Sequence, residues 1–171
     1  MSLTTTTKSP FSRRSRGADA VIRVQAEDFD MGAEISRLTQ GDTAIGGVCA
    51  FAGLVRDFAG DGGGAMTLEH YPGMTEKALG GIETEAHARW PLAKTLIIHR
   101  YGRLQPGDNI VLVVAASAHR QAAFEACHFL IDWLKTRAPF WKQEETRDGA
   151  HWVEAKSSDD TAADKWTNTK D

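Results

Sequence analysis

Five basic side chains at the predicted ends of helices and strands are the main candidates for chemistry in this 171-residue sequence. Two of them, His119 and Arg120, follow Ser117, which is a suitable N-cap for a helix. A helix N-terminus offers free N–H groups and the positive end of the dipole, so two cationic donors there suit a bound anion. The other interpretation is that both side chains are solvated, or that Arg120 pairs with an acid.

Lys135 ends a second, partly apolar stripe of the same predicted helix, after Phe124, His128 and Ile131 at helical spacing. Burial would lower the pKa of the ammonium group, which is how a lysine becomes a base or a nucleophile. The commoner arrangement is a lysine that extends to solvent and complements the negative end of the helix dipole.

Two further cations flank these elements. Lys142 lies just past Pro139 in RAPFWK, where a turn of the chain would place it beside Lys135. A neighbouring like charge would lower the pKa of either lysine further. Arg56 ends FAGLVR before a glycine-rich loop, a position that suits phosphate or carboxylate binding or a plain surface arginine.

Composition limits the classes of protein that fit. Hydrophobic residues make up 42% and charged residues 25%, which is typical of one soluble globular domain. The net charge of −3 argues against general nucleic-acid binding, and no apolar run approaches the roughly 18 residues that span a membrane.

Cys49 and Cys127 form no CxxC, so free thiols in a reducing cytoplasm are expected. The six histidines show no metal-ligand spacing.

The elements that would position these residues alternate between strands and helices. Residues 1–18 are predicted to be a disordered extension, 19–159 the folded domain and 160–171 a polar tail. Helices are predicted at 31–39, 74–90 and 118–136, and strands at 20–24, 44–51, 66–71, 94–101, 109–116 and 151–156. The turn around Pro106 predicts an antiparallel hairpin, so the fold class is α+β.

Several long segments resemble a known family. They are FAGLVRDF at 51–58, TLEHYPGMTEKAL at 67–79, ARWPLAK at 88–94, IHRYGRLQPGD at 98–108, SAHRQAAFEA at 117–126, LKTRAPFWK at 134–142 and WVEAKSSD at 152–159. In this order they resemble the large, catalytic subunit of molybdopterin synthase, the MoaE family. The resemblance implies a single domain of the α/β-hammerhead type, with a mixed or antiparallel sheet and about three helices.

The resemblance also implies an activity, that of a cytoplasmic sulfurtransferase. The enzyme would convert cyclic pyranopterin monophosphate (precursor Z) into molybdopterin by installing the two dithiolene sulfurs. The sulfur would arrive as a thiocarboxylate on the C-terminal Gly-Gly tail of a small ubiquitin-like subunit. Two large and two small subunits would form a heterotetramer, and no metal, redox cofactor, nucleic acid or membrane is implied.

Site residues carry over from the family by position. The two lysines of LKTRAPFWK, Lys135 and Lys142, match its active-site lysines. The substrate contacts would be Arg56, His119, Arg120, Gln143 and Glu144, with Phe51 as a pocket aromatic. Lys156 stands where relatives are expected to carry Arg, and Lys keeps the charge without the bidentate fork. Leu54 stands where some relatives have Lys, so it offers no ionic contact.

We therefore expect Lys135 to act as acid and base during sulfur transfer and opening of the cyclic phosphate, with transient capture of the tail's acyl carbon as a further role. Arg120 and Lys135 are 15 residues apart, about 22 Å along one unbroken helix. This separation predicts a site shared across a homodimer. Two alternatives are a non-catalytic module that binds a Gly-Gly tail and an RNA-binding α+β domain, although no RNP-like spacing of aromatics is present.

Overall fold

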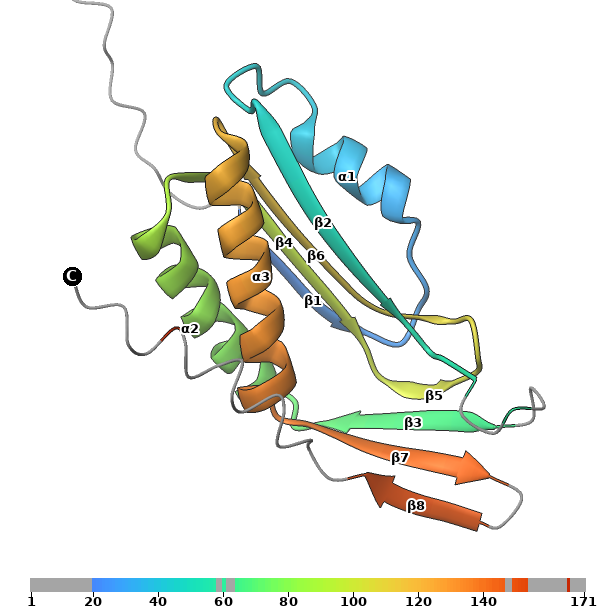
Figure 1. Cartoon of the computed structure of the whole chain (residues 1–171). Coiled ribbons are helices and arrows are strands. Elements are labelled where there is room, and N and C mark those ends of the chain that lie inside the picture. The colour runs from blue at the N-terminus through green and yellow to red at the C-terminus, as the bar shows by residue number, and fades with distance from the viewer. Residues whose placement is uncertain (1–19, 58–59, 61–63, 147–148, 154–165, 167–171) are drawn as a thin grey trace, which may run out of the picture.

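A four-stranded mixed sheet forms the centre of the fold in the computed structural model, which describes residues 20–57, 60, 64–146, 149–153 and 166 (Figure 1). Its strand order is β1-β4-β6-β2. The strands are β1 (Ala20–Gln25), β4 (Leu92–Arg100), β6 (Asn109–Ser117) and β2 (Gly47–Leu54). β1 runs parallel to β4, whereas β6 is antiparallel to both of its neighbours.

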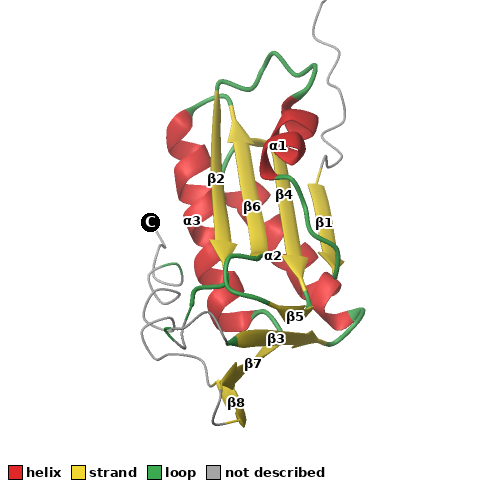
Figure 2. Cartoon of the chain, turned by 90° about the vertical axis from the view of Figure 1, so that its right-hand side faces the viewer, coloured by secondary structure: helices red, strands yellow, loops and turns green. Residues whose placement is uncertain are grey.

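Helices cover both faces of this sheet, which is why the centre of β4 and nearly all of β6 are apolar (Figure 2). α2 (Met74–Arg89) and α3 (Arg120–Arg137) lie on one face and α1 (Met31–Thr39) lies on the other. Successive side chains of a strand point to opposite faces of the sheet. Ile97 and Val113 pack in the cluster of α2 and α3, and Ile98 and Leu112 pack in the cluster that contains Leu38 of α1.

A second, smaller sheet lies near the C-terminal end of α3 (Figure 1). Its order is β5-β3-β7-β8, and all its pairings are antiparallel. The strands are β5 (Gly102–Leu104), β3 (Ala65–His70), β7 (Phe140–Thr146) and β8 (Gly149–Val153). Val55, Met66, Leu68 and Leu104 form a separate small core beside it.

The predicted α+β class with three helices is confirmed, and the predicted antiparallel pairing of the strands at 94–101 and 109–116 is that of β4 and β6. β5 and β7 are strands that the sequence did not predict. The strand predicted at 44–51 begins three residues later, at Gly47. Residues 1–18 and most of the predicted polar tail lie outside the described residues, but Trp166 packs against Trp90 and Phe129.

The link between β6 and α3 is packed tightly against the start of β2. Gly46 donates its N–H to the Ser117 carbonyl at 3.0 Å, and a Cβ on Gly46 would collide with the Ala118 carbonyl oxygen. Ser117 is not the N-cap that the sequence predicts, because β6 extends through it and His119 occupies the cap position. The Ser117 hydroxyl instead donates to the Pro91 carbonyl at 2.9 Å. These contacts fix where α3 begins.

Candidate functional site

A cavity of about 810 Å³ lies where the end of β2, the last turns of α3 and the strand β7 meet. Three cations line it: Arg56, Lys135 and Lys142. Its lining also includes Glu144, Phe51 and Leu54. Apolar side chains supply much of the remaining wall: Val55, Met66, Leu68, Ile110, Val111, Ile131, Leu134, Phe140 and Val153. We call this the basic cavity, because its charged groups are three cations and one carboxylate.

The bend after α3 brings the two lysines to this cavity. Lys135 lies in the last turn of α3, next to Leu134, which also lines the cavity. The helix ends at Arg137, and the next residue, Ala138, has an extended backbone (φ −71°, ψ 133°), as expected for a residue before proline. The chain then enters β7, whose third residue is Lys142. Lys135 is exposed in this chain, so the buried form of this lysine considered from the sequence is not found.

Strand alternation decides which residues of β7 face the cavity. Lys142 and Glu144 share one face, and Lys142 Nζ lies 2.7 Å from Glu144 Oε1. Gln143 lies between them and is not among the lining residues, as the two-residue period of a strand requires. The structure therefore places Glu144 in the basic cavity and excludes Gln143 from it, although the family resemblance implied contacts from both.

Arg56 is held at the cavity by the residue before it. The Val55 N–H donates to the Asp108 carbonyl at 2.9 Å, and the Val55 carbonyl accepts from the Gly107 N–H at 2.8 Å. These bonds tie the chain after β2 to the turn between β5 and β6. Arg56 is itself exposed, so its guanidinium is available to a ligand.

His119 and Arg120 lie at the opposite end of α3, and neither lines the basic cavity. α3 is continuous from Arg120 to Arg137, so the 15 residues between Arg120 and Lys135 span about 22 Å. Within one chain the structure thus separates these two predicted substrate contacts from the lysines. Lys156 lies outside the described residues.

His99 is a cavity residue that the sequence analysis missed. Its ring stacks on Phe140, with centroids 3.7 Å apart and an interplanar angle of 15°. Burial lowers the pKa of His99 to about 4, because the charged ring would lose its hydration. A signal was present in the sequence: Ile97 and His99 fall on one side of the predicted strand, so the histidine continues an apolar stripe.

Neither cysteine lines the basic cavity. The Cys127 thiol is buried, and its Sγ lies 3.8 Å from the Val113 carbonyl oxygen. Burial raises the pKa of this thiol, which disfavours the reactive thiolate. Within the described parts of the chain, no cluster of three His, Cys, Asp or Glu side chains could hold a metal ion. No helix in those parts is long and apolar enough to cross a membrane.

The fold and the cavity together define a class: an α+β protein with a cation-lined, apolar-walled cavity suited to anionic ligands. The sequence pattern of the MoaE protein family matches residues 24–137, and the chain belongs to this family.

Similar proteins cover nearly the same span. The molybdopterin synthase catalytic subunit of Pseudomonas aeruginosa is 58% identical over 147 residues, which are 85% of this chain and 97% of that protein. Its counterpart in Mesorhizobium japonicum is 55% identical over 152 residues, 88% of this chain and 95% of that one. The solved structure of the MoaE protein from Burkholderia ambifaria superposes with a TM-score of 0.75 at 51% identity, covering 86% of this chain and 98% of its own.

Proposed function

We propose that this chain is the catalytic subunit of a molybdopterin synthase and acts as a sulfurtransferase in the cytoplasm. It transfers sulfur from the thiocarboxylated Gly-Gly tail of a small ubiquitin-like subunit to cyclic pyranopterin monophosphate. The observation that carries the proposal is the basic cavity, in which Lys135 and Lys142 from two different elements meet beside Arg56. The activity named for relatives that are 55% and 58% identical supports it.

The charges of the cavity match both reactants. A thiocarboxylate and a cyclic phosphate are anions, and three cations on apolar walls attract both more strongly than bulk water allows. Each transfer forms one carbon–sulfur bond to the pterin and breaks one carbon–oxygen bond there, with the oxygen leaving on the opened phosphate or as water. Water then cleaves the acyl carbon–sulfur bond, which leaves the sulfur on the pterin and returns the tail to a carboxylate. One dithiolene therefore consumes two thiocarboxylates.

Lys135 is the proposed acid and base. Its exposure leaves the amine free to reach a reacting atom, and no carboxylate is paired with it among the ion pairs of the described residues. It would donate a proton to the opening phosphate oxygen, and the same amine could capture the tail's acyl carbon transiently. Lys142 would contact an anionic group of the substrate, in competition with the Glu144 carboxylate that lies 2.7 Å from its Nζ.

The site is proposed to be completed by a second copy of the chain. His119 and Arg120 are too far from Lys135 along α3 for one small pterin to touch both in the same chain. In a homodimer, these residues of one copy would face the lysines of the other, with Arg120 and His119 binding substrate phosphate. β2 supports such pairing, because it is an edge strand of the larger sheet with Val48 and Leu54 exposed.

Reconstitution tests this proposal. The purified chain is mixed with cyclic pyranopterin monophosphate and the thiocarboxylated small subunit, and dithiolene product is measured. We expect product that requires both proteins. Binding of the small subunit's tail without product would instead support the alternative, a non-catalytic module that holds a Gly-Gly tail.

A further inference from the structure

His99 lines the basic cavity as a neutral polar residue, whereas the cavity's other ionisable side chains are charged. It is the penultimate residue of β4 and is only 9% exposed. One face of its imidazole is covered by Phe140, which fixes the plane of the ring. Because the ring lines the basic cavity, its free edge is a feature that a bound ligand can contact.

The hydrogen bonds of His99 determine its tautomer. Nδ1 lies 2.9 Å from the Arg100 carbonyl oxygen, and a carbonyl can only accept, so Nδ1 carries the proton. Burial and the nearby His70 both disfavour the charged ring and hold the pKa of His99 near 4. At neutral pH, Nε2 is therefore an unprotonated acceptor.

Within the described part of the chain, the His99 side chain hydrogen-bonds through Nδ1 and not through Nε2. The residue lines the basic cavity, where a bound donor can meet the unpaired nitrogen. A hydrogen-bond acceptor surrounded by apolar walls binds a donor strongly. A ligand without a donor binds more weakly, because the acceptor is then buried without a partner.

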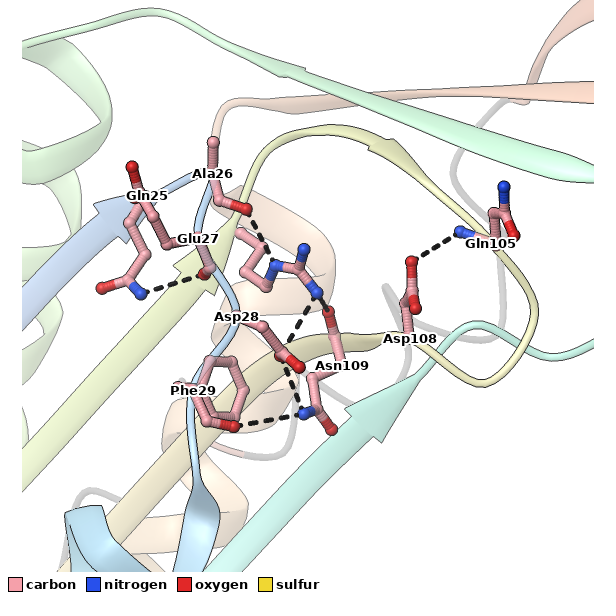
Figure 3. Close-up of polar contacts among 9 residues, drawn as sticks. Gln25, Ala26, Glu27, Asp28, Phe29, Gln105, Asp108 and Asn109 are labelled. Atoms are coloured by element: carbon pink, nitrogen blue, oxygen red, sulfur yellow. Dashed lines mark hydrogen bonds and ion pairs between the residues drawn. The ribbon is translucent and has the colours of Figure 1, made fainter.

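The carbonyl that orients His99 is itself held in place. The largely buried Arg100 guanidinium donates to the Ala26 carbonyl at 3.1 Å and to the Asn109 carbonyl at 3.0 Å, and it pairs with Asp28 at 3.3 Å. Asn109 also donates to Asp28 at 2.9 Å (Figure 3). This network joins the ends of β1, β4 and β6, so the tautomer and the position of His99 are set before a ligand arrives.

We propose that His99 Nε2 accepts a hydrogen bond from an N–H donor of the ligand in the basic cavity and thereby positions it against the lysines. This inference rests on the proposed function, because the ligand is one of the two proposed reactants. The cations of the cavity bind the anionic groups of these reactants and cannot accept a hydrogen bond from their N–H groups. The donor is either a ring N–H of the pterin or a backbone amide of the Gly-Gly tail. Both offer the same chemistry to Nε2.

Three variants test the acceptor. His99→Asn keeps an N–H for the Arg100 carbonyl but has no atom at the Nε2 position, and His99→Phe keeps the stack on Phe140 and loses both polar atoms. His99→Gln places an amide oxygen near the Nε2 position. We expect Asn and Phe to raise KM about tenfold for one reactant, and Gln to recover most of the loss. The reactant whose KM rises identifies the donor.

The controls separate the two proposals. If the wild-type chain makes no dithiolene, the proposed function fails. If the wild type is active and His99→Asn leaves both KM values unchanged, the inference about His99 is overturned. If the variants do not fold, nitrogen NMR of the wild-type chain labelled at histidine tests the inference instead. Adding the pterin alone, or the unthiolated small subunit alone, should shift Nε2 upfield for one of them, and no shift with either would contradict the proposal.

Discussion

Lys142 and Glu144 project from the same face of β7, and their Nζ and Oε1 atoms lie 2.7 Å apart in the basic cavity. Both side chains are partly exposed, at 38% and 27%, so the pair stabilises the fold by at most about 1 kcal/mol. Its larger effect is on ligands. An anion that binds Lys142 must compete with a carboxylate that already neutralises it.

Glu144→Gln should therefore tighten anion binding. The variant keeps the shape of the side chain and removes its charge, so the Kd for inorganic phosphate should fall about fivefold in a calorimetric titration at low salt. The free energy of unfolding should change by less than about 1 kcal/mol. Glu69→Gln is the matched control, since Glu69 is exposed on β3 and does not line the cavity. Equal tightening in both variants would contradict the placement of the anion site.

Burial of His99 predicts a pH dependence of stability. The unfolded chain protonates this ring near pH 6.5 and the folded chain only near pH 4, so the unfolded state binds more protons between these values. Stability should fall as the pH drops through this window, by about 3 kcal/mol over its full width. Hydrogen bonds from Asn109 and Arg23 lower the pKa values of Asp28 and Glu34 from 3.8 and 4.5, respectively. Protonation of these two carboxylates therefore affects stability only below pH 4.5.

Urea unfolding at pH 6.5 and at pH 4.5 measures this slope. His99→Phe keeps the aromatic stack and removes the titrating group, so its free energy of unfolding should vary much less between the two conditions. An unchanged slope in this variant would show that another group is responsible.

A shared site predicts complementation between inactive variants. Arg120→Ala and Lys135→Ala chains, co-expressed with different tags, form heterodimers that tandem purification isolates. If each site takes Arg120 from one copy and Lys135 from the other, every heterodimer keeps one intact site and one doubly altered site. It should recover about half of the wild-type activity. If the heterodimer is as inactive as the two parent variants, the site is not shared between two copies of the chain.

The central elements were predictable because their sequences are strongly patterned. β4 and β6 are buried on both faces, so they form apolar runs in the sequence, and α3 carries an apolar stripe that ends shortly before Pro139. β7 was not predictable from its own residues. Its sequence, FWKQEET, is largely polar, and it becomes a strand through antiparallel pairing with β3, which is distant in the chain, and with β8.

The site was predictable only in part, for a similar reason. The bend at Pro139 indicated that Lys135 and Lys142 lie near each other, and both line the basic cavity. Which neighbours of Lys142 face the cavity depends on the register of β7, which pairs Gln143 with Thr67 and Glu144 with Met66. The exposure of Lys135 depends on packing between elements that no local pattern encodes, whereas the burial of His99 follows the apolar stripe that it shares with Ile97.

The most direct test of the account is the rate of sulfur transfer by Lys135→Ala in a single turnover with thiocarboxylated small subunit. Lys77→Ala is the matched control, because Lys77 is exposed on α2 and does not line the basic cavity. We predict a loss of at least about 100-fold for Lys135→Ala, with normal folding and normal binding of the small subunit, and no loss for the control. A folded Lys135→Ala protein that transfers sulfur within about twofold of the wild-type rate would contradict the account.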